Sequence, residues 1–194
     1  MRSLPVPIET TALRRTRQNH PGGPWERLEG ASKRELKLVL LENQQNVCAW
    51  CEVTIGADNS HLDHIRTRNT SPQLIFAVDN LLAACQNPRT CGHGRQNKGS
   101  LPPWVHPYET EDLEDRIDYY PDGSLVPASI LSEATQREAD EAINRQLNLN
   151  ADTLKERRER RMVEIGTYCG QGFTVEDLME ILPDFPTLTK KLCR

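Results

Sequence analysis

Four cysteines in two pairs constrain the fold of this chain more than any other feature. Cys48 and Cys51 form a C-x2-C turn, and Cys85 and Cys91 form a C-x5-C pair further along the chain. A structural zinc ion takes four ligands in a tetrahedron, and two short cysteine loops supply two corners each. The spacing therefore predicts a zinc centre that holds the segment between residues 48 and 91 together.

Other interpretations of the cysteines are open at this point. The sequence C-A-W-C also resembles a dithiol active site, but such a site normally follows a strand, whereas a charged helix is predicted before Cys48. Four buried thiols without a metal are the plainest alternative. This alternative is disfavoured because two cysteine clusters lie in a segment with a small core. Cys169 and Cys193 stand alone in the sequence and are interpreted as ordinary residues.

Composition excludes some classes of function. The chain has 194 residues with 24 Lys and Arg against 28 Asp and Glu, a formal net charge of −4. This balance disfavours a protein that holds nucleic acid by bulk charge alone. No run approaches the roughly 20 apolar residues of a membrane span, and the N-terminus lacks the apolar stretch of a secretory signal. We therefore expect a soluble, cytoplasmic protein with no membrane partner.

Composition also divides the chain into three segments. Residues 1–31 are rich in Pro, Gly and charge and predict an arm, for which no fold is predicted. Residues 32–107 carry the paired cysteines, and residues 108–194 begin with an acidic loop and a small hairpin. The pattern predicts an α+β fold in a mostly helical chain, with strands at 52–55 and 61–66 and helices at 32–45, 78–84, 91–99, 131–147, 151–168 and 175–182.

Histidines, acids and amides concentrate in the cysteine segment. They are His61, Asp63, His64, Asn80, His93 and Asn97. Hydrolysis of a phosphodiester needs a base to activate water and a cation to stabilise the developing charge, and Asp beside His can supply both. Each histidine taken alone is more simply explained as a structural residue. Neighbours in a regular strand point to opposite faces, so Asp63 and His64 need a bulge or a strand end to face one metal.

In this order, the elements resemble the HNH endonuclease family. They are the C-x2-C turn, the Asp63-His64 pair, Asn80 in an N-L-L-x-x-C phrase, and a final segment with His, Asn and Lys. The resemblance implies a zinc-stapled ββα-metal core in residues 32–107. It also implies that His64 is the general base, that Asp63 binds a catalytic Mg²⁺ or Mn²⁺, and that Asn80 braces the loop and orients the base.

The last ligand of the catalytic metal is ambiguous between two residues. His93 and Asn97 are four apart and share a helix face if a helix begins near Cys91, and we favour His93. Many HNH relatives place His or Asn directly after the final cysteine, where this chain has Gly92. His61 shares a strand face with Asp63 and is a candidate additional ligand.

A closer similarity is to HNH proteins of bacterial anti-phage systems, the Septu and retron-associated PtuB-type nucleases. It rests on the phrases Q-N-V-C-A-W-C-E, H-L-D-H-I-R and T-C-G-H with N-K, and on I-N-R-Q-L-N-L-N downstream. Such nucleases work with an ABC/SMC-like ATPase, sometimes with a retron reverse transcriptase and its RNA–DNA. The resemblance thus implies the same kinds of partner here. It leaves open whether the substrate is DNA or an RNA such as tRNA.

Basic residues beside these motifs suggest a phosphate-binding face. They are Arg66, Arg68, Arg95 and Lys98, and a solvated surface is the simpler alternative. The run of alternating charge at 155–161 is likewise more simply a solvated helix than a nucleic-acid site. The alternative function from another class is a zinc-binding adaptor that recruits a partner or nucleic acid without catalysis.

Overall fold

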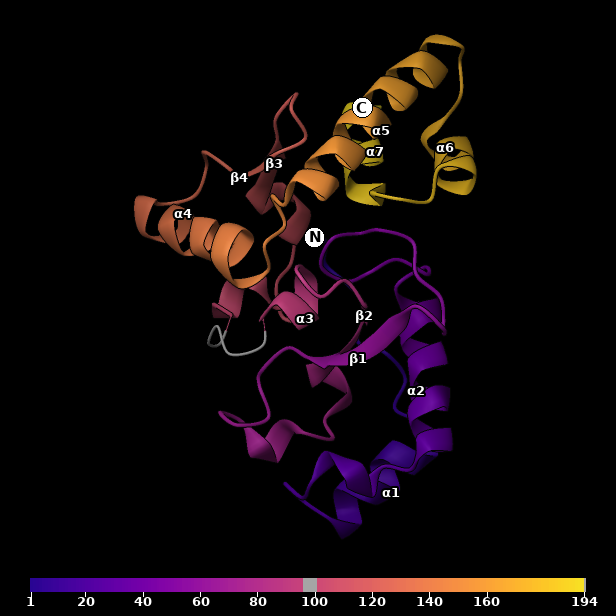
Figure 1. Ribbon diagram of the computed structural model, residues 1–194, viewed down its shortest axis with the longest axis vertical. Helices are drawn as coiled ribbons and strands as arrows, with labels where there is room; N and C mark the ends of the chain where they lie inside the picture. Colours follow the sequence, from indigo (N-terminus) through magenta and orange to yellow (C-terminus); the bar gives the residue numbers. More distant parts are fainter. Residues whose placement is uncertain (96–100, 194) are drawn as a thin grey trace.

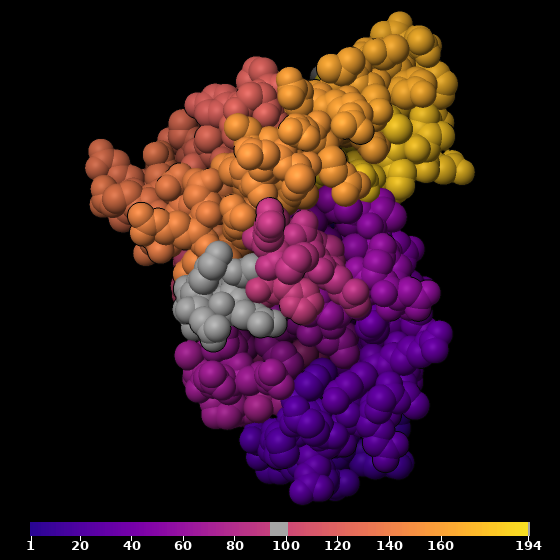
Figure 2. Space-filling model, in the orientation of Figure 1, coloured from indigo at the N-terminus to yellow at the C-terminus, as the bar shows by residue number. Residues whose placement is uncertain are grey.

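The computed structural model describes residues 1–95 and 101–193, which form a mixed α/β protein (Figure 1). Helices α1 (Thr11–Asn19) and α2 (Gly30–Asn43) lie at one end of the long axis. Helices α5 (Asp152–Gly170), α6 (Val175–Ile181) and α7 (Pro186–Leu192) lie at the other, as Figure 2 also shows. Between them is a small sheet. No helix among the described residues is both long and apolar enough to cross a membrane.

The central sheet is an antiparallel hairpin of β1 (Ser60–His64) and β2 (Leu81–Cys85), which is followed by the short helix α3 (Cys91–Arg95). The helix predicted at 78–84 is wrong, because only residues 78–80 form a helical turn and the rest is β2. Residues 81–84 are all apolar and all buried. A short run of this kind shows no alternation of apolar and polar residues, so its sequence does not distinguish a strand from a helix.

Residues 52–55 do not form the predicted strand; a single bridge pairs Val47 with Thr54. The buried side-chain amide of Gln44 hydrogen-bonds to the backbone of β2. Gln44, at the end of α2, accepts a hydrogen bond from the Ala83 backbone N–H at 2.8 Å and donates to the Ala83 carbonyl at 2.8 Å. The side-chain amide therefore pairs with the outer edge of β2 as the backbone of a neighbouring strand would. A polar residue at a helix end gave no sign of this in the sequence.

The N-terminal arm is folded onto the protein. Besides α1 it contains a helical turn, η1 (Trp25–Arg27), and its first residues are tied to the chain beyond residue 106. The Leu4 N–H donates to the Pro107 carbonyl at 2.9 Å, and the Ser3 N–H donates to Glu114 Oε2 at 3.0 Å. Helix α2 begins at Gly30 after Glu29, so Ser32 is not its N-cap.

A second hairpin, β3 (Ile117–Tyr119) with β4 (Leu125–Pro127), agrees with the predicted one. The predicted helix at 131–147 is present as α4 (Glu133–Asp140) continued by a π-helical turn, η6 (Glu141–Gln146). Short helical turns complete the chain: η2 (Pro72–Leu74), η3 (Val78–Asn80), η4 (Pro103–Val105) and η5 (Leu113–Arg116).

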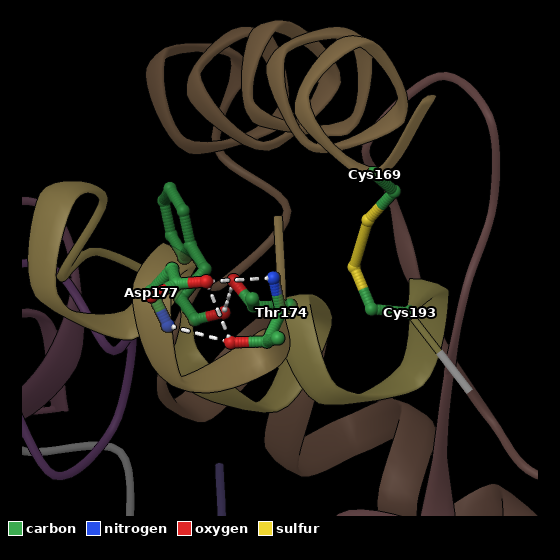
Figure 3. Close-up of a disulfide and its surroundings, with 6 residues drawn as sticks. Cys169, Thr174, Asp177 and Cys193 are labelled. Carbon is green, nitrogen blue, oxygen red and sulfur yellow. Dashed lines mark hydrogen bonds between the residues drawn. A yellow bond between two sulfur atoms is a disulfide. The ribbon is translucent and has the colours of Figure 1, made fainter. Parts of the chain in front are cut away.

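The C-terminal helices have a core of their own, built from Ile165, Leu178, Phe185 and Leu188. Helix α6 begins where predicted, at a capping box in which Thr174 and Asp177 exchange side-chain and backbone hydrogen bonds (Figure 3). Cys169 and Cys193 form a disulfide that joins the end of α5 to the end of α7. Their interpretation as ordinary residues is therefore wrong: the helices fold back and bring together cysteines 24 residues apart.

The charged run of α5 is largely exposed, as its interpretation as a solvated helix predicts, and Arg158 is its one buried residue. The Arg158 guanidinium donates to the Gly123 and Leu149 carbonyls at 2.5 and 2.7 Å. At the surface, Arg157 Nη2 lies 2.6 Å from Asp184, and Lys155 Nζ lies 2.9 Å from Asp122. These three bases attach α5 to its neighbours.

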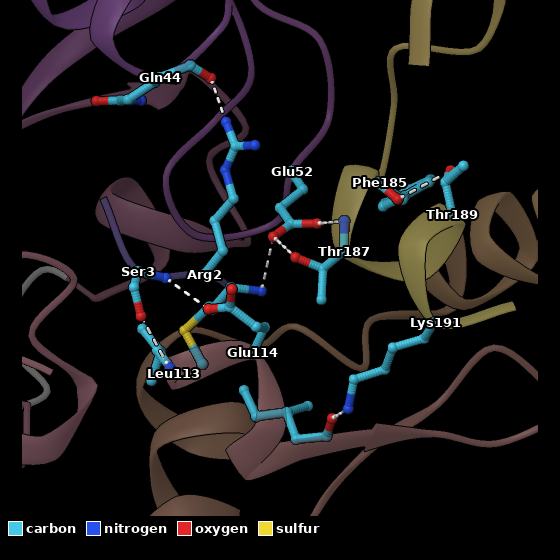
Figure 4. Close-up of polar contacts among 12 residues, drawn as sticks. Arg2, Ser3, Gln44, Glu52, Leu113, Glu114, Phe185, Thr187, Thr189 and Lys191 are labelled. Carbon is cyan, nitrogen blue, oxygen red and sulfur yellow. Dashed lines mark hydrogen bonds and ion pairs between the residues drawn. The ribbon is translucent and has the colours of Figure 1, made fainter. Parts of the chain in front are cut away.

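Glu52 joins the cysteine turn to the C-terminal helices (Figure 4). Its carboxylate is buried and accepts hydrogen bonds from the Thr187 N–H at 3.0 Å and the Thr187 hydroxyl at 2.5 Å. The Met1 ammonium lies 3.2 Å from the same carboxylate. Burial alone raises the pKa of Glu52, but the ammonium and the Thr187 hydrogen bonds outweigh it and lower the pKa below 4.5.

Candidate functional site

The four paired cysteines meet at the base of the hairpin. Cys48 and Cys51 come from the turn after α2, Cys85 ends β2, and Cys91 begins α3. All four Sγ atoms lie within 4.8 Å of one another, with Cys51 Sγ 3.9 Å from Cys85 Sγ. Tetrahedral zinc with Zn–S bonds of about 2.3 Å places sulfurs roughly 3.8 Å apart. Four thiolates at this spacing could hold a metal ion such as zinc.

The thiols polarise one another in a way that suits a cation. Hydrogen bonds from Cys48, and then from Cys51 and Cys91, lower the pKa of the Cys85 thiol far below its ordinary value. Hydrogen bonds with Cys48 and Cys85, together with burial, raise the pKa of Cys51. The protein alone therefore favours the thiolate at Cys85 and the thiol at Cys51. A divalent cation would supply the charge needed to deprotonate the rest.

A second cluster lies on one face of β1. The β1–β2 register pairs His61 with Ala84 and Asp63 with Leu82, residue for residue and without a bulge. His61 and Asp63 therefore share a face, and α3 brings His93 to them, with the His61 and His93 ring centroids 4.0 Å apart. The structure thus brings together three of the residues predicted to act on phosphodiesters.

Gly92 makes this approach possible. A Cβ built on Gly92 would lie 2.6 Å from Asp63 Oδ2 and 2.8 Å from His61 Nε2, both closer than carbon can come. A side chain here would have to displace the Asp63 carboxylate and the His61 ring or move α3. A glycine lets the helix start lie directly against the carboxylate.

Burial favours the neutral form of His61. Its pKa is lowered chiefly by desolvation, with Asp63 opposing that shift and His93 adding to it. Its Nδ1 is buried and has no hydrogen-bond partner among the described residues. A neutral imidazole is the form that binds a metal ion or accepts a proton.

His64 points away from this cluster. Its Nε2 lies 3.1 Å from the Ile75 carbonyl oxygen, and its ring meets Trp25 edge-on with the centroids 4.8 Å apart. Because a carbonyl only accepts, Nε2 carries the proton, and the lone pair of the neutral ring is on Nδ1. Asp63 and His64 therefore face opposite sides of β1, as the alternation of a regular strand requires.

Asn80 fixes the loop that joins the two strands. It is buried, accepts from the Arg66 N–H at 2.7 Å and donates to the Arg66 and Leu74 carbonyls at 3.1 Å each. It holds both ends of the loop that supplies the Ile75 carbonyl to His64. Asn80 acts on the histidine through the backbone and does not contact its ring in these hydrogen bonds.

The predicted phosphate-binding residues are divided by the structure. Arg68 is exposed, but Arg66 lies 2.8 Å from Glu109, so that much of its charge is compensated. The side chain of Arg95, and all of Asn97 and Lys98, lie outside the described residues. Of the two candidates for the last ligand of the catalytic metal, His93 lies among the described residues and Asn97 does not.

The donor set of the second cluster favours some cations over others. Among the described residues, the four cysteines are the one group of three or more His, Cys, Asp or Glu whose ligand atoms all lie within 4.8 Å. His61, Asp63 and His93 are more loosely arranged and offer two imidazoles and one carboxylate. Mg²⁺ prefers oxygen ligands, whereas imidazole suits transition metals, so this set fits Mn²⁺ better than Mg²⁺.

No family model matches the chain, and no curated protein is detectably similar to it.

Proposed function

We propose that the chain is a metal-dependent endonuclease of the HNH type, which hydrolyses phosphodiester bonds in nucleic acid. The observation that carries the proposal is the placement of His61, Asp63 and His93 together by a hairpin and a following helix. The cysteine cluster, which joins the turn after α2 to the end of β2 and the start of α3, supports it. A cation at such a site would stabilise charge on the phosphate and on the leaving oxygen.

We propose that the Asp63 face holds the cation; proton transfer by His64 is proposed on the resemblance alone, because the structure turns the His64 ring to the other side of β1. His61 and His93 lie with Asp63 and are the natural ligands, which leaves His64 as the histidine outside the set. Its hydrogen bond to the Ile75 carbonyl fixes one tautomer, so that Nδ1 would take a proton from water. The backbone position of Ile75 is held in turn by Asn80.

Cleavage of supercoiled plasmid and of tRNA, with Mn²⁺ or Mg²⁺, tests the proposal and the substrate class together. Asp63→Ala and His64→Ala should each lower cleavage at least about 100-fold, a typical contribution of such groups. His64→Ala should keep Mn²⁺ binding by calorimetry, whereas His61→Ala should weaken it. The exposed His20→Ala is the matched control. Undiminished cleavage by both Asp63→Ala and His64→Ala would refute the nuclease and leave the zinc-binding adaptor.

The role in defence and the partners are proposed on the resemblance alone. Co-purification of the chain with an ABC/SMC-like ATPase, with and without a retron reverse transcriptase, is the direct test.

A further inference from the structure

We infer that Trp50 is a positioning residue that connects the cysteine cluster to the candidate site, an inference that rests on the function proposed above. Trp50 lies between Cys48 and Cys51 and is completely buried. Its indole N–H donates to Asp63 Oδ2 at 2.8 Å. The turn that supplies Cys48 and Cys51 therefore also donates a hydrogen bond to the Asp63 carboxylate, which is expected to bind the cation.

Two residues beside the cysteines enclose that carboxylate. Trp50 donates to Oδ2, and Gly92, directly after Cys91, allows α3 to lie against the same oxygen. Each belongs to a different cysteine loop, so joining the loops fixes both contacts at once. Asp63 thus depends on the cysteine cluster for its orientation although it contacts no sulfur in these interactions.

The hydrogen bond has a defined chemical effect. An indole N–H can only donate, so it occupies a lone pair of Oδ2. The carboxylate cannot rotate without breaking this bond in a buried site, where an unpaired indole N–H is costly. Asp63 is therefore held in one orientation before a cation arrives. Outer contacts of this kind typically change metal affinity 10- to 100-fold.

The test replaces Trp50 by phenylalanine, which keeps an aromatic ring and removes the donor. Trp104→Phe is the matched control, because the Trp104 Nε1 is buried but has no hydrogen-bond partner among the described residues. We expect Trp50→Phe to retain its zinc content and to bind Mn²⁺ about 10-fold more weakly by calorimetry. Trp104→Phe should bind Mn²⁺ as the wild type does.

A double-mutant cycle separates positioning from a general loss of structure. In the Asp63→Asn background, Trp50→Phe should cause no further loss of Mn²⁺ affinity. In indole-¹⁵N-labelled wild type, the Trp50 N–H resonance should shift on Asp63→Asn, which is visible even if Trp50→Phe fails to fold. Wild-type affinity in Trp50→Phe, equal losses in both backgrounds, an unshifted resonance, or no Mn²⁺ binding by the wild type would each overturn the inference. Absence of cleavage alone would refute the nuclease and leave these readouts standing.

Discussion

The region of the β1–β2 hairpin and α3 and the region of the C-terminal helices are held together by different means. The hairpin and α3 pack into the larger apolar core, in which Trp50, Leu81 and Leu82 are completely buried, and four cysteines, a buried Gln44 and a buried Asn80 are added to that packing. The C-terminal helices depend on an apolar cluster and a disulfide. The candidate chemistry lies in the region where cysteines and buried amides are added to the apolar packing.

This difference teaches where positional precision comes from. A cluster of sulfurs fixes the ends of two loops at once, and Trp50 and Gly92 carry that constraint to Asp63. An apolar core tolerates repacking, but a ligand set must keep its geometry to a fraction of an ångström. A cysteine cluster close to the site therefore fixes the geometry of the ligands more directly than apolar packing does.

The largest expected effect is loss of the cysteine cluster. Cys48→Ser should remove zinc and destabilise the hairpin region by several kcal/mol, because structural zinc sites contribute on the order of 10 kcal/mol of binding to folding. Zinc content by atomic emission and urea unfolding followed by circular dichroism measure this. The double variant Cys169→Ser/Cys193→Ser is the matched control and should keep its zinc. A stable, zinc-free Cys48→Ser protein would show that the thiols only pack.

The connection between the two regions gives the next effect. Glu52→Gln leaves the Met1 ammonium without its partner in a buried position and should cost about 3 kcal/mol, as breaking buried ion pairs does. Exposed Glu42→Gln is the control. Chemical unfolding of the two variants and of the wild type measures the difference.

The Glu52 contribution also has a predicted pH dependence. Since the folded-state pKa lies below 4.5, the stabilisation is complete above pH 4.5 and is lost as pH falls through the depressed pKa. The gap between wild type and Glu52→Gln should therefore be constant from pH 5 to pH 7 and should narrow in stronger acid. A gap that widened on acidification would contradict the assigned ion pair.

The sequence predicted the parts of the site that depend on residue type and spacing. Four cysteines at metal-ligand spacing indicated a cluster, and that cluster is formed. Thr174 with acids in the next turn indicated a helix start, which is also correct. Such features are local, and each follows from the chemistry of a few neighbouring residues.

What the sequence could not predict depends on contacts between distant segments. β2 was mistaken for a helix because residues 81–84 are buried on all sides. The Cys169–Cys193 bond requires α7 to return to α5, and Glu52 finds Thr187 only after the same folding. Trp50 gave no signal beyond its place between two cysteines, because its partner Asp63 is reached only when the turn packs against β1.

The disulfide is expected to contribute about as much as Glu52 does, and its location sharpens the contrast between the two regions. Reduction of the Cys169–Cys193 bond, or Cys169→Ser/Cys193→Ser, should cost about 3 kcal/mol in the free energy of unfolding, as a bridge closing a loop of this length does. Hydrogen exchange should locate that loss in α5 and α7, while amides of β1 and β2 keep their protection. Cys48→Ser should give the reverse pattern. Loss of protection in the hairpin on reduction would mean that both regions unfold as one unit, with the Glu52 contacts transmitting the change.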